Sequence, residues 1–220
     1  MSLRSKIRTP FRYSFSNATL TIIALNVLSY LVFAVTPLNE RLFGLSVAGF
    51  LYNKLLWQPV TYLFVHAGFR HLFFNMLALV FFGLSVEKAI GTKEFVLMYS
   101  VVGVLSGVFS VLAYFFYGKY LMRVGVYPTI YMVNIVGASG AIYGILFSYA
   151  AFFPRNRIFI WGLIPIPAPV LVLAYAVLAF FGQFSGSNVA HMTHLAGFGC
   201  AFLYIVVRMG MNPLKIWFGR

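Results

Sequence analysis

Ser139 is the residue whose setting best suits it to act as a nucleophile. It lies in a Gly-Ala-Ser-Gly stretch at residues 137–140, at the head of an apolar run. A serine hydroxyl becomes an effective nucleophile only when a base takes its proton, and histidine is the usual base near neutral pH. His194 opens another apolar run near the C-terminus and could supply that base. The two residues together predict a Ser–His dyad.

A second group of residues could stabilise the negative oxygen that such an attack creates. His71 and Asn75 are four residues apart, so they would share one face of a helix and could both donate hydrogen bonds to an oxyanion. Ser139 is expected at a helix N-terminus, where free backbone N–H groups serve the same purpose. Gly137 and Gly140 flank the serine and would let a substrate carbonyl approach closely.

The orientation of the base is expected to depend on an aromatic ring rather than on a carboxylate. Tyr143 lies one turn after Ser139 on the same helix face and could stack on the ring of His194. The chain contains no Asp, and two of its three acids fall on the side of the membrane away from the serine, while the third, in an outer loop, is not excluded by depth. We therefore expect a dyad rather than a triad. The three acids are Glu40, Glu87 and Glu94.

The composition is that of an integral membrane protein. Of 220 residues, 62% are hydrophobic and only 9% are charged, and several apolar runs are long enough to cross a bilayer. In lipid such runs should be helices, because a helix satisfies its own backbone hydrogen bonds. The net charge of +13 comes from short groups of cations between the apolar runs. Such groups meet anionic lipid, so the bilayer is an expected partner and nucleic acid is not.

The sequence favours neither a cofactor nor a metal. Its single cysteine, Cys200, excludes an internal disulfide and a multi-cysteine metal site. His191 and His194 could form a His-x-x-His pair, but no carboxylate or cysteine completes a ligand set. We expect structural roles for His191 and for His66, which would hold the first long loop in place.

The expected fold is all-α, a polytopic membrane protein with a bundle of six transmembrane helices. A basic segment at 1–17 would precede a membrane domain at 18–209, which contains a long loop at 36–70, and a tail at 210–220 would follow. Prolines at 165, 167 and 169 exclude a regular helix interior, so 158–169 should be extended. The expected spans cover 18–35, 71–86, 95–117, 139–153, 170–184 and 191–207.

The distribution of Lys and Arg predicts the orientation. With six spans, eleven of the 16 cations fall on the side of the N-terminus and five on the other side. Cations accumulate on the cytoplasmic side, so both termini should be cytoplasmic. His71, Ser139 and His194 then all begin helices near the outer surface, at similar depth. The first apolar run lacks a cleavage site and is expected to be a retained span.

Small residues favour close contact between two of these spans. The fourth has Gly140-xxx-Gly144 and the sixth has Gly197-xxx-Ala201. Small residues four apart let membrane helices approach closely. If these two helices touch, Ser139 and His194 come within hydrogen-bond reach.

Taken together, these motifs resemble those of the rhomboid intramembrane serine proteases. The resemblance runs from about Trp57 to Ala201 and keeps the family's order and spacing. Many members carry Trp-Arg where this chain has Trp57-Gln58, and glycine is common at two sixth-span positions that hold Ala196 and Ala201. The segments that carry the resemblance are residues 66–76, Gly83 with Val86, Glu87, Lys88 and Gly91, then 137–144, 164–168 and 188–197.

The resemblance implies roles for the site residues. Ser139 would be the nucleophile and His194 the general base, and the oxyanion hole would consist of His71, Asn75 and the backbone N–H of Ser139. It also implies a water-filled cavity that opens outward, a first loop partly embedded in the outer leaflet, a cap at 185–188 and a fifth span that moves to admit substrate.

The expected function is that of an intramembrane serine endopeptidase of a prokaryotic plasma membrane. Its partners would be transmembrane proteins that carry small or helix-destabilising residues near the outer surface, and no particular oligomeric state is implied. The absence of Asp excludes an aspartyl protease, and the absence of His-Glu-x-x-His excludes a zinc protease of that type. The alternatives are a catalytically silent rhomboid-like protein that escorts membrane clients, and a transporter or channel. Polar residues at helix ends rather than at the midplane argue against the latter.

Overall fold

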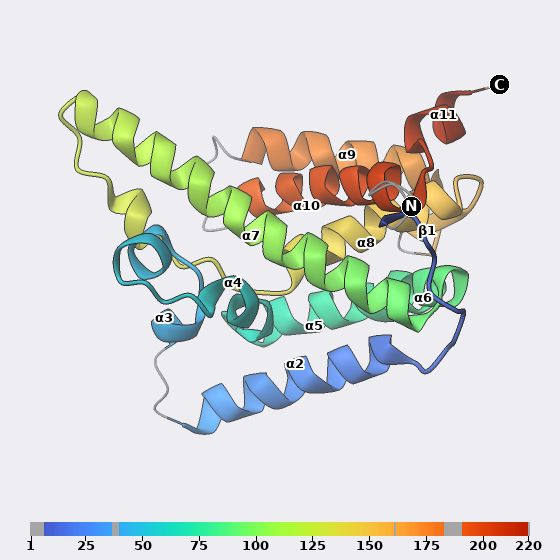
Figure 1. The fold of residues 1–220 in the computed structure, drawn as a ribbon, viewed down its shortest axis with the longest axis horizontal. Coiled ribbons are helices and arrows are strands. Elements are labelled where there is room, and N and C mark those ends of the chain that lie inside the picture. Colours follow the sequence, from blue (N-terminus) through green and yellow to red (C-terminus); the bar gives the residue numbers. More distant parts are fainter. Residues whose placement is uncertain (1–6, 37–39, 161, 183–190, 220) are drawn as a thin grey trace.

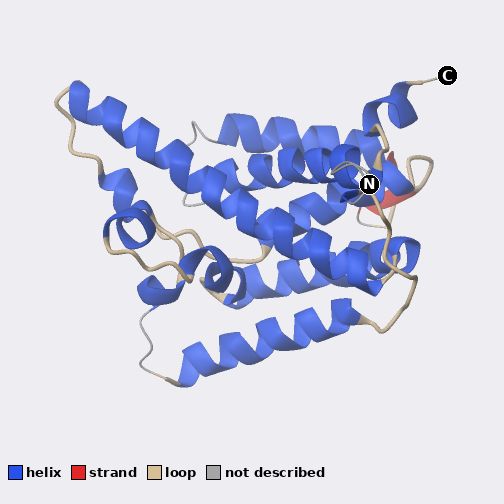
Figure 2. Cartoon of the chain, in the orientation of Figure 1, coloured by secondary structure: helices blue, strands red, loops and turns tan. Residues whose placement is uncertain are grey.

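The computed structural model describes residues 7–36, 40–160, 162–182 and 191–219, and almost all of its regular structure is helical (Figures 1 and 2). Four helical stretches are long and apolar enough to cross a membrane: Ala18–Val35, Phe69–Ile90, Thr92–Arg123 and His191–Met209. These stretches identify an integral membrane protein. Two further apolar helices, α8 (Ser139–Phe152) and α9 (Ala168–Gly182), are shorter.

Of the six spanning helices that the sequence predicts, four are long enough to cross the membrane and two are shorter. Helix α8 has 14 residues and α9 has 15, which correspond to about 21 and 23 Å of helix, short of a hydrocarbon core of about 30 Å. A helix whose end is sunk below the membrane surface does not need the full length. This shortfall matters for the site, because Ser139 is the first residue of α8.

The four long stretches consist of α-helices and, in two of them, a wider π-turn. The first is α2 (Ala18–Val35) and the third is α7 (Thr92–Arg123). The second consists of α5 (Phe69–Ala78), the π-turn η3 (Leu79–Gly83) and α6 (Leu84–Ile90). The fourth consists of α10 (His191–Tyr204) and the π-turn η5 (Ile205–Met209), and α11 (Pro213–Phe218) follows it.

Helix α8 lies in the middle of the bundle and packs against α7 and α10. Ten of its 14 residues are buried. Its glycines are the reason it can lie so close to α10: a methyl group added at Gly197 would strike the carbonyl oxygen of Gly140, and one at Gly144 would lie 3.3 Å from Cβ of Ala201. The predicted contact between the spans at 139–153 and 191–207, which correspond to α8 and α10, is confirmed.

The long loop between α2 and α5 is folded. It contains α3 (Glu40–Phe43), the π-turn η1 (Ala48–Tyr52), α4 (Gln58–Thr61) and the 3₁₀ turn η2 (Tyr62–Phe64). The buried side chain of Gln58 donates to the Arg41 carbonyl at 3.0 Å, and Trp57 Nε1 donates to the Leu42 carbonyl at 2.8 Å. The pair found in place of Trp-Arg thus holds the loop together.

Buried carboxylates tie the other end of the bundle together. The carboxylate of Glu87 accepts hydrogen bonds from the backbone N–H groups of Ala18 and Thr19 at 2.8 and 2.9 Å, so it caps the N-terminus of α2. The carboxylate of Glu94 forms an ion pair with Arg208 at 2.9 Å, which joins α7 to the end of the fourth stretch. Both acids therefore have structural partners.

The proline-rich stretch is extended, as expected, and forms a hairpin of β1 (Arg157–Ile160) and β2 (Ile164–Pro167), paired antiparallel with Ile158 opposite Ile166. Pro169 lies in the first turn of α9, where proline is tolerated because the first N–H groups have no partner in the helix. The fifth helix therefore begins two residues earlier than expected. The expected loop at 185–188 lies outside the described residues.

Candidate active site

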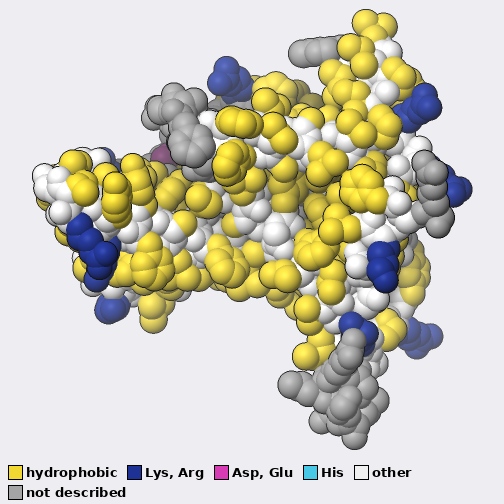
Figure 3. Space-filling view, turned by 90° about the horizontal axis from the view of Figure 1, so that it is seen from above, with side chains coloured by type: hydrophobic (Ala, Val, Ile, Leu, Met, Phe, Trp, Pro, Cys, Tyr) yellow, Lys and Arg dark blue, Asp and Glu magenta, His cyan; other side chains and the backbone are white. Residues whose placement is uncertain are grey.

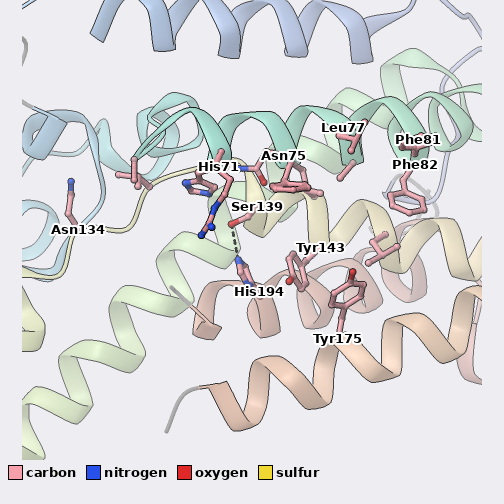
Figure 4. A pocket seen from close by; sticks show the side chains of 17 residues that line it. His71, Asn75, Leu77, Phe81, Phe82, Asn134, Ser139, Tyr143, Tyr175 and His194 are labelled. Atoms are coloured by element: carbon pink, nitrogen blue, oxygen red, sulfur yellow. Dashed lines mark hydrogen bonds between the residues drawn. The ribbon is translucent and has the colours of Figure 1, made fainter. Parts of the chain in front are cut away.

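Ser139 and His194 lie side by side. Oγ of Ser139 and Nε2 of His194 are 2.9 Å apart, a hydrogen bond between residues 55 positions apart in the sequence (Figure 4). Ser139 begins α8, and His194 is one turn into α10. The imidazole is buried and the serine is half-buried. The structure thus brings together the two residues expected to form the dyad.

The ring of Tyr143 lies flat against the imidazole of His194. The two ring centroids are 4.0 Å apart and the planes differ by 7°. The other side of the tyrosine meets Tyr175 of α9 edge to face at 6.0 Å. No Asp or Glu is among the described residues that line this site.

His71 and Asn75 face the serine from α5 (Figure 4). Asn75 is buried, and its Nδ2 has no hydrogen-bond partner within the described ranges, so its donor is free for a bound group. Gly137 has φ +105, and a Cβ there would lie 2.5 Å from Cε1 of His71. Gly137 therefore makes room for the His71 ring. Its role in admitting a substrate carbonyl stays a prediction.

Gly140 packs against two neighbouring helices. A Cβ at this position would lie 2.6 Å from Oγ of Ser106 and 2.8 Å from Cγ2 of Thr193. These atoms belong to α7 and α10, so a side chain at this position would point into the helix interface. The role of Gly140 in admitting a substrate carbonyl stays a prediction.

The site opens into a cavity of about 570 Å³ between α5, α8 and α9. His71 and Asn75 lie close to Ser139 and His194 on its wall, Asn134 lies apart from them, and aromatic and aliphatic side chains cover much of the rest (Figure 4). A cavity of this kind suits an apolar chain whose reacting group is polar. Its apolar lining includes Phe74, Leu77, Phe81, Phe82, Ile142 and Leu146.

Three polar lining residues were not singled out from the sequence: Arg70, Asn134 and Tyr175. Arg70 directly precedes His71 in the motif segment, and this position could have identified it. Tyr175 lies within a uniformly apolar run, which gives no signal for one side chain over another. Asn134 precedes the Gly-Ala-Ser-Gly stretch, and only the folded chain brings it to the cavity.

His66 is buried beside His71. The two rings meet edge to face with centroids 5.1 Å apart, and neither ring nitrogen of His66 has a partner among the described residues. Burial, with a smaller effect from the neighbouring His71, lowers the pKa of His66 to about 4. His66 is therefore neutral near pH 7, and its ring packs against that of His71.

His191 lies at the start of α10, away from the serine. Its ring is edge-on to His194 at 6.2 Å, and a Cβ at Gly182 would lie 2.5 Å from its Cε1, so it packs against the end of α9. Across the described ranges no three His, Cys, Asp or Glu side chains are placed to share a metal ion.

Comparison with known proteins identifies the class to which this fold and site belong. Residues 53–210 match the family description "Rhomboid domain". The chain belongs to the rhomboid family.

Several curated relatives carry protease names. The chain is 31% identical over 185 residues to "Putative rhomboid protease YdcA" of Bacillus subtilis, covering 83% of each chain. It is 33% identical over 153 residues to "Rhomboid protease AarA" of Providencia stuartii, covering 66% of this chain and 53% of the relative. Over a shorter stretch of 73 residues, 33% of this chain and 21% of the relative, it is 32% identical to "Inactive RHOMBOID-like protein 8" of Arabidopsis thaliana. Intramembrane proteolysis is thus supported at the level of the family.

Proposed function

We propose that this chain is an intramembrane serine endopeptidase that cleaves transmembrane segments of other membrane proteins with Ser139 and His194. The observation that carries the proposal is the 2.9 Å contact between Oγ of Ser139 and Nε2 of His194 at the wall of a cavity. That distance is within the range required for proton transfer between a nucleophile and its base.

In the first half of the reaction, Oγ of Ser139 attacks the scissile carbonyl carbon while Nε2 of His194 takes the hydroxyl proton. The resulting oxyanion accepts hydrogen bonds from Nδ2 of Asn75, from the ring of His71 and from the backbone N–H of Ser139. The protonated His194 then gives its proton to the leaving amine. The C–N bond breaks, and an acyl ester on Ser139 remains.

In the second half, water attacks the ester carbonyl and His194 takes its proton. The oxyanion again lies against Asn75 and His71, and collapse of the tetrahedral intermediate expels Ser139 Oγ, which recovers its proton from His194. The second product leaves as a carboxylic acid. Tyr143 keeps the imidazole plane fixed through both halves, a task that a carboxylate performs in a triad.

The depth of the site explains which bonds it would cut. If Phe152 marks one hydrocarbon boundary, the 14 residues of α8 place Ser139 about 10 Å below the other boundary. A peptide bond in an intact helix is shielded by its own hydrogen bonds. Small or helix-destabilising residues would therefore mark the cleavage region, because the substrate must unwind to enter the cavity.

The test is labelling of the full-length protein in liposomes with a fluorophosphonate that reacts with activated serines. We expect wild type to be labelled, Ser139→Ala to be unlabelled, and His194→Ala to lose at least about a hundredfold in rate. The matched control is Ser148→Ala, which removes a buried serine of the same helix that donates to the Gly144 carbonyl. Labelling that survives Ser139→Ala would overturn the assignment.

One observation supports a second function. One of the similar proteins is named inactive, so similarity of this kind is not limited to relatives named as proteases. The alternative is a protein that binds and escorts membrane clients. It predicts no fluorophosphonate labelling and no cleavage of any model transmembrane substrate, together with client binding that Ser139→Ala leaves unchanged.

A further inference from the structure

Helix α7 is longer than a membrane span requires. Its 32 residues correspond to about 48 Å, whereas the hydrocarbon core is about 30 Å thick and the bilayer with both headgroup layers is about 40–45 Å thick. Figure 1 shows α7 extending past the neighbouring helices at the end of the molecule opposite the marked termini. The first residues of α7 are fixed at the other end by the Glu94–Arg208 ion pair. The excess length therefore lies at the far end.

The far end of α7 continues an apolar stripe that starts within the span. Its members recur every three or four residues, so they share one helix face, and each is 39% to 66% exposed. The same face thus leads without a break from the middle of the helix into the projecting part. Surface that faces lipid along the span would face the headgroup layer further out. The stripe consists of Leu105, Phe109, Leu112, Phe116 and Tyr120.

We define residues 114–132, the end of α7 and the turn that follows it, as the distal arm. Tyr117 and Tyr120 stack on each other with centroids 6.4 Å apart, and Tyr127 is 74% exposed. The charges of the arm are Lys119 and Arg123, and the sequence has no acid between positions 95 and 138. Figure 3 shows hydrophobic side chains over this end of the molecule with Lys and Arg side chains among them. Exposed aromatics with cations are the composition of a membrane interface.

The arm is braced against the rest of the chain. Its 3₁₀ turn η4 (Thr129–Met132) places the ring of Tyr131 directly on Gly118, where a side chain would collide with it. Tyr131 Oη also donates to the Phe115 carbonyl at 3.1 Å, and the ring contacts Tyr52 of the first loop at 5.8 Å. The arm is thus a fixed part of the fold.

We propose that the distal arm lies in the headgroup layer of the bilayer and binds anionic lipid there. The helix length matches a bilayer with its headgroups, the apolar stripe is continuous with the lipid-facing surface, and the arm's charges are all positive. Anionic headgroups attract Lys and Arg near the surface, while tyrosine rings suit the boundary between apolar and wet regions. The arm would hold the tilt and depth of the bundle. This inference does not depend on the activity of Ser139.

The test measures the depth of a nitroxide label on the full chain in vesicles. The only native cysteine, Cys200, is buried and is replaced by serine so that single cysteines can be labelled at Tyr120, at Tyr127 and, as the deep reference, at Phe109. Accessibility to oxygen and to a nickel chelate then reports depth. We expect the nickel accessibility at Tyr120 and Tyr127 to be higher than at Phe109. It should be several-fold lower than that of a free nitroxide.

The second arm of the experiment varies charge. Vesicles of phosphatidylcholine alone are compared with vesicles that also contain phosphatidylglycerol. We expect deeper immersion at Tyr120 with the anionic lipid, and we expect Lys119→Gln with Arg123→Gln to remove the difference between the two compositions. Nickel accessibility equal to that of the free nitroxide at both positions would overturn the proposal, because the arm would stand in water. Dipolar coupling between labels on two copies would also overturn it, since a second copy would then cover the arm.

Discussion

The ring of Tyr143 stacks on the face of the His194 imidazole, whereas the carboxylate of a triad would bond its Nδ1–H at the ring edge. It covers one face of the His194 imidazole at 4.0 Å, and this contact uses the ring rather than the hydroxyl. Aromatic stacking is worth about 0.5–1.5 kcal/mol beyond area burial. The stack therefore restricts rotation of the imidazole while leaving the 2.9 Å contact with Ser139 unobstructed.

This geometry predicts a difference between two substitutions of Tyr143. Tyr143→Phe keeps the ring and should retain kcat within about threefold. Tyr143→Ala frees the imidazole and should lower kcat roughly ten- to a hundredfold, with KM little changed, because a small misplacement of a catalytic group is costly. Steady-state cleavage of a model transmembrane substrate would measure both constants. Equal losses for the two variants would assign the role to the hydroxyl instead.

His66 gives a prediction about pH and stability. Its pKa falls from an ordinary 6.5 to about 4 in the folded protein, mainly through burial. Below pH 6.5 the unfolded chain therefore binds a proton that the folded chain does not, so stability is full above that pH and falls as the pH drops toward 4. The loss is at most about 3 kcal/mol. Since neither ring nitrogen has a partner in the described structure, His66→Phe should remove this loss.

Thermal unfolding in detergent between pH 8 and pH 4.5 would measure the effect. We expect the wild-type Tm to fall more steeply than that of His66→Phe over the acid half of the range, with similar values at pH 8. Parallel curves for the two proteins would mean that His66 is protonated in the folded state, contrary to its burial.

The site residues differed in how well the sequence predicted them. Ser139 and His194 were paired because each begins an apolar run, and the structure brings them into contact. The sequence did not predict which residues become neighbours through packing of helices. The contact of Gly137 with His71 and that of Gly140 with Ser106 depend on how α8 sits against α5 and α7, which local spacing does not encode.

At the level of helices, two glycines of α10 offer a matched pair. A Cβ at Gly197 would strike the main-chain oxygen of Gly140, whereas nothing lies within 4 Å of a Cβ at Gly199. Gly197→Ala should push α10 from α8 and lengthen the distance between Ser139 and His194. Gly199→Ala should be neutral, or stabilise the helix by up to about 1 kcal/mol.

The rate of fluorophosphonate labelling would compare these variants. We expect a loss of roughly a hundredfold for Gly197→Ala and wild-type behaviour for Gly199→Ala. Equal rates in all three proteins would show that the helices absorb the extra methyl group without moving the site.

The ends of a helix were predictable where an apolar run has polar residues on both sides. They were less predictable where tertiary contacts determine where the helix begins and ends. The first span matches α2 at both ends. Helix α7 runs three residues earlier and six later than the expected 95–117, because the Glu94–Arg208 pair holds one end and Tyr131 braces the other. The long loop was predicted only by its bounds, and the hydrogen bond from Gln58 to the backbone carbonyl of Arg41 that organises it is not revealed by any sequence pattern.

For the whole molecule, the predicted orientation depends on which cations lie at which end. Arg8 donates to the carbonyls of Val206 and Val207, and Tyr13 donates to that of Lys88, so the N-terminal segment lies at the same end as Arg208. The distal arm, with Lys119 and Arg123, lies at the opposite end (Figure 1). The end with more cations should face the cytoplasm, which would put the distal arm outside and the cavity near the outer surface.

Accessibility of single cysteines in intact bacterial cells tests this orientation. Glu40 and Lys215 are both exposed and belong to opposite ends, while the buried Cys200 gives a low background. We expect an impermeant maleimide to label Glu40→Cys in intact cells, and to label Lys215→Cys only after the cells are opened. The parent protein with Cys200 alone should remain unlabelled in both conditions. The reverse pattern would place Ser139 near the cytoplasmic surface, and the substrates would then be helices destabilised at their cytoplasmic ends.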